Sequence, residues 1–220
     1  MISRKIFSDS DDCIHYAFHV LWDIYPLSED EYRMMSVERR ASYDYLVQII
    51  EMGYKLVGIV LKNQGEFPVK GYRARFIQAQ EANILSNTFV RILNEFALLR
   101  NKSVHENKRI NKELSLYPQL GSLVLVGFAL WELFDWRNRK KNYYEKLEFG
   151  PAYLEGWLKP SEMISNDPQE REHALEHELT KKRALAKLKK DKQLPVFTIA
   201  CPNSLLSSDD YSRQKKETRQ

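Results

Sequence analysis

The sequence predicts an all-α protein: a bundle of four to five helices, then a charged helical extension and a disordered tail. Its 220 residues include only eight Gly and eight Pro, few for a β-sandwich or barrel, which needs many tight turns. The apolar fraction is 43%, enough for a core, and apolar residues recur three and four positions apart. We expect the bundle within residues 1–150 and the extension within residues 151–220.

The first helices are marked by apolar periodicity and by breakers. A helix is expected over residues 12–25, and Pro26 ends it because proline has no amide hydrogen to donate. Residues 28–31 are typical of an acidic first helical turn. A long amphipathic helix is then expected over residues 37–62, followed by a loop rich in Gly and Pro.

The next two helices carry the clearest patterns. Residues 72–99 predict one continuous helix, whose apolar seam has alternating steps of four and three: Leu85, Phe89, Ile92, Phe96 and Leu99. Another helix is expected over residues 122–147, apolar in its first half and basic and aromatic in its second.

The C-terminal part changes in composition. Residues 168–192 are dense in Glu, Lys and Arg and are expected to be helical at least in part. Residues 195–200 are a short apolar patch, expected to dock as a strand or an extended segment. Residues 204–220 are expected to be a disordered tail.

Charge and cysteine content indicate a cytoplasmic protein without a membrane partner. The formal net charge is +4, too small by itself to mark a nucleic-acid binder. Cys13 and Cys201 form no disulfide framework, which favours a reducing compartment. Residues 1–12 show no secretory signal, and the most apolar run, residues 120–134, is shorter than the ~20 residues of a membrane span.

One motif carries chemistry: Arg100 and His105, with Asn101 beside the arginine. Metal-independent cleavage of a phosphodiester needs a base for the 2′-hydroxyl, a cation for the phosphorane and an acid for the leaving oxygen. Histidine suits the proton transfers because its ordinary pKa lies near neutrality. Arginine suits the phosphate because its planar fork donates parallel hydrogen bonds. Asn101 is expected to orient either partner or to contact phosphate.

The five-residue spacing constrains how these two side chains meet. On a continuous α-helix they lie about 140° apart around the axis, off one face. They converge only if the helix ends between Arg100 and His105, or if two subunits bring their motifs together.

The pattern Arg-polar-x-x-x-His at Arg100, Asn101 and His105, between two apolar helices, resembles the HEPN superfamily of four-to-five-helix domains. The resemblance covers residues 12–147 by helix order and six residues by motif. It implies a HEPN-type bundle, a homodimer with one composite site for an RNA substrate, no metal or other cofactor, and a toxin or antiviral defence setting. An antitoxin or defence-system partner would fit that setting, although Asn107 stands where some of these toxins carry a modified Tyr.

Contacts to RNA are expected from basic and aromatic residues near the motif and after the last bundle helix. The expected RNA-binding residues are Lys102, Arg137, Arg139, Lys140, Lys141, Tyr143 and Tyr144. Cations would neutralise phosphates and tyrosines would stack on bases. The basic run at residues 181–192 is either a solvated helix face or a non-specific phosphate clamp.

Three other histidine patterns and one alternative function stay open. His15 and His19, one helical turn apart, are a possible metal pair, and His-x-x-Glu-His at residues 173–177 has the inverted zinc-peptidase pattern. Arg171 and His177 repeat the bare Arg/His spacing in a charged segment. The alternative function is a non-catalytic helical adaptor or RNA-binding dimer with an incidental motif.

Overall fold

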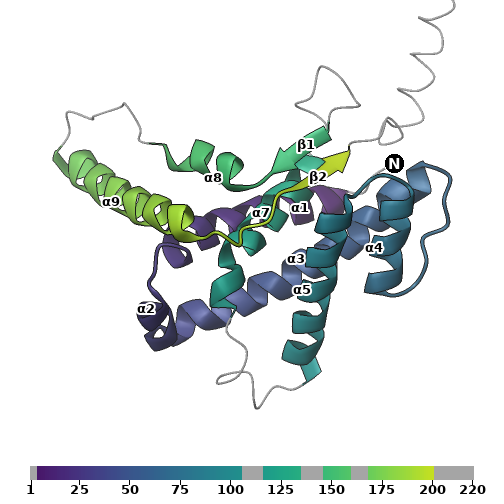
Figure 1. Cartoon of the computed structure of the whole chain (residues 1–220), viewed down its shortest axis with the longest axis horizontal. Helices are drawn as coiled ribbons and strands as arrows, with labels where there is room; N and C mark the ends of the chain where they lie inside the picture. Colours follow the sequence, from purple (N-terminus) through teal and green to yellow (C-terminus); the bar gives the residue numbers. More distant parts are fainter. Residues whose placement is uncertain (1–3, 106–115, 135–145, 160–167, 201–220) are drawn as a thin grey trace, which may run out of the picture.

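A computed structural model describes residues 4–105, 116–134, 146–159 and 168–200 (Figure 1). Side-chain surroundings are described for these residues other than 4–11, 63, 102–105, 134, 146 and 168–173. The described chain is mostly helical with one two-stranded sheet, which confirms the all-α fold class. None of the helices in these ranges is long and apolar enough to cross a bilayer.

The helices of the bundle are α1 (Arg4–His19), α3 (Ser36–Asn63), α4 (Tyr72–Glu81), α5 (Asn87–His105) and α7 (Leu120–Phe134). The most buried of them is α7. Every residue of α7 from 123 to 130 is buried, as its uninterrupted apolar sequence predicts. Gly127 lets α1 approach closely, since a Cβ there would lie 2.9 Å from the Cβ of Ala17.

The first helices end near their expected positions, although α1 begins eight residues earlier than expected. Helix α1 starts at Arg4 and continues through a π-helical turn, η1 (Val20–Ile24), which ends two residues before Pro26. The acidic turn is the start of α2 (Glu29–Met34), where Ser28 and Glu31 form a reciprocal capping box. The long helix expected over residues 37–62 is α3.

The continuous helix expected over residues 72–99 is wrong, because the chain breaks between α4 and α5. Asn83 adopts a left-handed conformation with φ 57°, which asparagine tolerates better than most residues. The backbone of the break pairs instead with the C-terminal strand: Ala200 N donates to Ile84 O at 2.9 Å and Ser86 N donates to Thr198 O at 3.1 Å. Tertiary hydrogen bonds thus replace helical ones.

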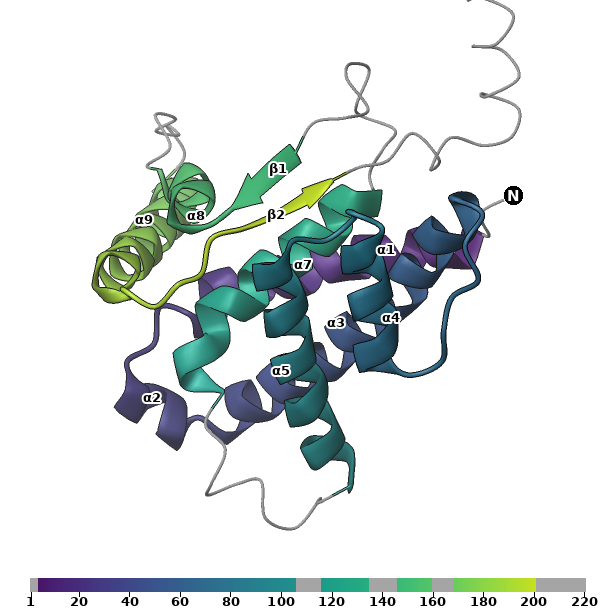
Figure 2. The ribbon, with the colours of Figure 1, turned by 45° about the vertical axis from the view of Figure 1, so that its right-hand side comes forward.

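The segment expected to be one helix over residues 122–147 is also different. Helix α7 ends at Phe134, and β1 (Lys146–Phe149) pairs antiparallel with β2 (Phe197–Ala200), Phe149 opposite Phe197 (Figure 2). The apolar patch at residues 195–200 therefore docks as a strand, as expected. Phe197 stacks on Phe89 with ring centroids 4.3 Å apart, which fixes the sheet to α5.

Between the strands, the chain forms α8 (Pro151–Leu158) and α9 (Pro168–Lys190). Helix α9 confirms the helix expected in the charged segment. Ala184 and Leu188 are buried in the same core as the bundle. The tail expected to be disordered, residues 204–220, lies outside the described residues.

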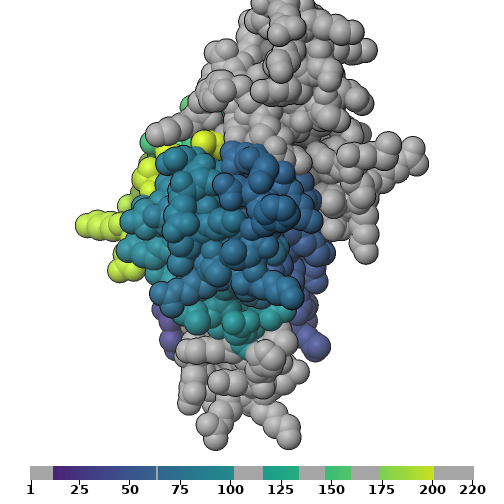
Figure 3. Space-filling view, turned by 90° about the vertical axis from the view of Figure 1, so that its right-hand side faces the viewer, coloured from purple at the N-terminus to yellow at the C-terminus, as the bar shows by residue number. Residues whose placement is uncertain are grey.

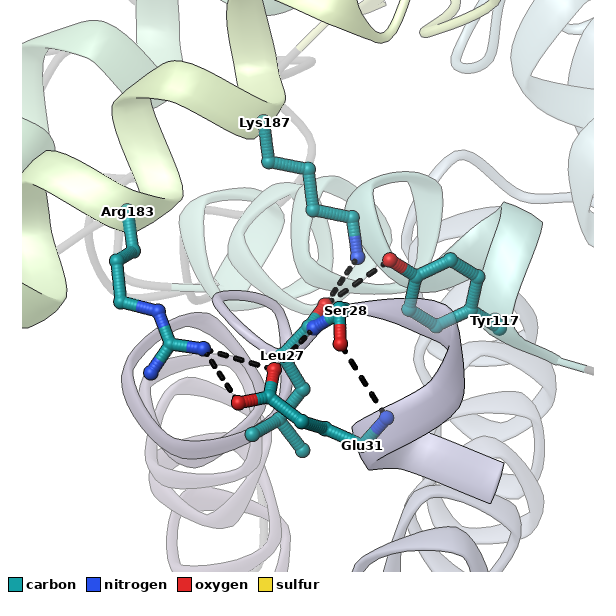
Figure 4. A network of polar contacts seen from close by, with 6 residues as sticks. All are labelled: Leu27, Ser28, Glu31, Tyr117, Arg183 and Lys187. Carbon is teal, nitrogen blue, oxygen red and sulfur yellow. Dashed lines mark hydrogen bonds and ion pairs between the residues drawn. The ribbon is translucent and has the colours of Figure 1, made fainter. Parts of the chain in front are cut away.

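Polar contacts join α9 to the α2 region and to the 3-10 turn η2 (Tyr117–Gln119) (Figure 4). Arg183 Nη2 donates to both carboxylate oxygens of Glu31, at 2.8 and 2.7 Å. Lys187 Nζ donates to Leu27 O at 3.4 Å and lies 3.7 Å from the ring centroid of Tyr117. These contacts fix the charged helix on the bundle in one orientation.

Candidate functional site

The Arg100 side chain lies where α5 meets α3 and α4. Its guanidinium forms an ion pair with Glu51 of α3, and only 19% of the arginine side chain and 30% of the glutamate side chain are exposed. Tyr72 of α4 donates its hydroxyl hydrogen to the same carboxylate oxygen at 2.5 Å. Three helices therefore converge on one carboxylate.

The Tyr72 ring provides a second contact for the arginine. Arg100 Cζ lies 5.3 Å from the centroid of that ring, within the range of a cation–π interaction. Burial, and next its hydrogen bond to Glu51, raise the pKa of Tyr72 to about 12. The phenol therefore stays protonated at neutral pH and remains a donor to Glu51.

Asn101 completes the contacts of the guanidinium. Arg100 Nη1 donates to Asn101 Oδ1 at 3.1 Å. Among the described residues, the Nε of Arg100 is buried without a hydrogen-bond partner. A guanidinium has five N–H donors, and Glu51 and Asn101 each accept a hydrogen bond from one of its two Nη atoms.

A second arginine lies beside this cluster. Arg75 of α4 lies over the Tyr54 ring of α3, with Cζ 3.6 Å from the centroid, and its Nη1 donates to Tyr54 O at 3.1 Å. Gly58 makes room for it, since a Cβ there would lie 3.0 Å from Arg75 Nη1. The Tyr54 and Tyr72 rings lie 4.7 Å apart and so link the two arginines.

The structure excludes one of the two ways in which Arg100 and His105 were expected to meet. Helix α5 runs through His105 without a break, so the helix does not end between them and that alternative is wrong. Five residues of helix separate the two Cα positions by about 140° around the axis and ~7.5 Å along it. The side chains of Lys102 and His105 are not among those whose surroundings the structure describes.

Other expected RNA-binding residues also lie outside the described residues: Arg137, Arg139, Lys140, Lys141, Tyr143 and Tyr144. Sequence reasoning missed four residues around Arg100: Glu51, Tyr54, Tyr72 and Arg75. The sequence held a signal for Glu51, because it is one of only two charged residues in the mostly apolar stretch from residue 46 to residue 61.

The metal alternatives gain no support from the described residues, which contain no group of three His, Cys, Asp or Glu side chains able to hold an ion. His19 lies 3.5 Å from Asp23 and packs on Tyr45. His177 packs on the Trp22 ring, with centroids 4.9 Å apart. Both histidines thus have local contacts of an ordinary surface kind.

Comparisons with protein-family models, with curated proteins and with solved structures find no match for this chain. Functional inference therefore depends on the residues themselves and on the geometry around Arg100.

Proposed function

We propose that the protein is a metal-independent endoribonuclease that cleaves RNA through the ribose 2′-hydroxyl, in a toxin or antiviral defence setting. The observation that carries the proposal is the Arg100 guanidinium, held by Glu51, Tyr72 and Asn101 five residues, or about 1.4 helical turns, before His105. The resemblance of this motif to HEPN domains supports the same chemistry.

In the proposed reaction, His105 removes the proton of the 2′-hydroxyl, and the 2′-oxygen attacks the adjacent phosphorus. Arg100 stabilises the charge that develops on the phosphorane oxygens, because its remaining N–H groups donate charge-assisted hydrogen bonds. The 5′-oxygen leaves with a proton from an acid. The products carry a 2′,3′-cyclic phosphate and a 5′-hydroxyl, so water is not consumed in this step.

Two subunits supply the site in this proposal. Since α5 is continuous, Arg100 and His105 of one chain do not share a helix face. A homodimer that brings two copies of this helix end together places the arginine of one chain near the histidine of the other. It also provides two histidines, one as base and one as acid.

Glu51 has a defined part in this arrangement. It orients Arg100 and partly offsets its charge, while Arg75 nearby keeps the cluster positive overall. An anionic phosphate therefore still meets a net positive site. Glu51 and Tyr72 act as positioning residues, because they contact the arginine.

The test is cleavage of end-labelled single-stranded RNA in EDTA by the wild type and by Arg100→Ala. The matched control is Arg91→Ala, which removes an exposed arginine from the same helix. We expect Arg100→Ala to lose activity by about 100-fold or more, with wild-type products ending in a cyclic phosphate. Absence of cleavage by a folded wild type would favour the non-catalytic adaptor.

A further inference from the structure

The loop between α3 and α4 holds a phenylalanine out in solvent. Phe67 is 91% exposed, more than any other large apolar side chain whose burial is described. Single exposed apolar residues are common and need no explanation by themselves. Phe67 differs because the backbone that carries it is fixed on both sides.

A glutamine side chain clamps the backbone around Phe67. Gln78 Nε2 donates to Phe67 O, and Gln78 Oε1 accepts from Val69 N, each at 3.0 Å. Between them, Pro68 restricts the conformation of the residue before it. The exposed ring therefore projects from a rigid support, and little conformational entropy is lost when a ligand packs on it.

The same loop is tied to the Arg100 cluster. Arg75 Nε donates to Val69 O at 3.0 Å, and Gly71 N donates to the Tyr54 hydroxyl at 3.3 Å. Tyr54 packs on Tyr72, which contacts Arg100 through Glu51 and through its ring. Gly65 and Gly71, with φ of 83° and 92°, allow the chain to turn at the two ends of the loop.

Positive charge surrounds this loop. From residue 55 to residue 75 the chain carries five cations and one anion, and Lys62, Lys70 and Arg73 are all exposed. Figure 3 shows that the loop and α4 form one continuous outer face of the molecule beside α5. Exposed cations around a fixed aromatic ring suit a single strand of nucleic acid, whose bases stack while its phosphates are neutralised.

We propose that the α3–α4 loop binds the unpaired part of an RNA substrate, with Phe67 stacking on a base and Lys70 and Arg73 contacting phosphates. The substrate class is then single-stranded RNA, because bases in a duplex are already stacked and paired. This inference rests on the proposed ribonuclease function for its choice of RNA. The surface is a continuation of the Arg100 cluster through Arg75 and Tyr54.

The experiment measures binding apart from cleavage. Fluorescence anisotropy with a labelled single-stranded RNA and with the same sequence as a duplex is recorded for the full chain carrying His105→Ala. Phe67→Ala is added to this background and compared with Phe67→Trp. Met34→Ala is the matched control, because Met34 is an apolar side chain of α2 that is 85% exposed.

We expect Phe67→Ala to weaken single-strand binding about 5- to 100-fold, as the loss of one stacked base predicts. Phe67→Trp and Met34→Ala should bind as the parent does, and the duplex should bind more weakly. Lys70→Ala with Arg73→Ala should lower the salt dependence of binding, which Phe67→Ala should leave unchanged.

Parent-like binding by Phe67→Ala, or equal affinity for single strand and duplex, overturns the inference. Loss of self-association in Phe67→Ala without loss of RNA binding also overturns it, and assigns the ring to a protein contact. Failure of the ribonuclease proposal can be told apart from failure of this inference. The first appears as absence of RNA cleavage by the wild type, whether or not the protein binds RNA.

Discussion

Glu51 on α3 forms an ion pair with Arg100 on α5 and also accepts a hydrogen bond from Tyr72 on α4. The carboxylate thus contacts Arg100 and ties three helices together. Replacing it with a neutral amide keeps the shape of the side chain and removes its charge.

Glu51→Gln should lower the free energy of unfolding by about 1–3 kcal/mol, the usual cost of losing a charge-assisted hydrogen bond in a partly buried site. Urea unfolding measures the free energy of unfolding of Glu51→Gln, Arg100→Gln and the double variant, which together with the wild type form a double-mutant cycle. The two effects should be non-additive by at least ~0.5 kcal/mol. Additive effects would mean that the pair contributes nothing to stability.

The proposed sharing of the site between two subunits has a kinetic consequence. If Arg100 and His105 act from different chains, the cleavage rate per chain should fall when the protein is diluted below its dimer dissociation constant. Sedimentation measures the dimer fraction over the same concentrations, and the two curves should coincide. A rate per chain that stays constant where the protein is monomeric would contradict a shared site.

Gly127 tests the close packing of α1 on α7. In Gly127→Ala the new Cβ would lie 2.9 Å from Ala17 Cβ and 3.2 Å from Cys13 O. Helix α1 must then shift, which should cost about 1–3 kcal/mol of stability despite the better helix propensity of alanine. Thermal and urea unfolding measure the change.

Gly156→Ala is the matched control on α8, since nothing lies within 4 Å of a Cβ there. It should stabilise the protein by up to about 1 kcal/mol through helix propensity alone. Equal effects of the two substitutions would show that α1 and α7 are not closely packed at Gly127.

Lys187 should make stability depend on pH in the alkaline range. Its burial lowers its pKa to about 8, against the raising effect of Asp191 and Glu29. Between pH 8 and its ordinary pKa of 10.5, the unfolded chain binds more protons at this lysine than the folded chain. The contribution of Lys187 to stability therefore rises as pH rises through this window and is constant below it.

The effect is measured as the difference in free energy of unfolding between the wild type and Lys187→Met, followed from pH 7 to pH 10. Relative to the variant, the wild type should gain stability above pH 8. Leu27 O keeps its hydrogen bond from the Tyr117 hydroxyl at 2.9 Å, so the variant leaves no unpaired carbonyl. Lys182→Met, at an exposed position of α9, should show no such gain; a pH-independent difference for Lys187 would contradict the prediction.

Much of the fold could be predicted from local pattern. Apolar periodicity predicted α3 within one residue at each end, and the acidic cap at Ser28 predicted the start of α2. What failed was long-range: the break after α4 and the strand β1 both depend on pairing with β2, which lies about fifty or more residues away. No local pattern encodes such a partner.

The candidate site divides in the same way. The motif indicated Arg100 and Asn101, which the structure brings together. Tyr72 was assigned to a helix start without a role, and Glu51 was missed. Their contacts arise only when α3, α4 and α5 pack against one another.

The most direct test of the proposed ribonuclease activity is the rate of cleavage of a single-stranded RNA in EDTA by the wild type and by His105→Ala. His15→Ala, which removes an exposed histidine from α1, is the control. We expect cleavage by the wild type and by the control, and a loss of at least about 100-fold in His105→Ala with its fold and self-association intact. Equal cleavage by His105→Ala, or none by the folded wild type, would contradict it.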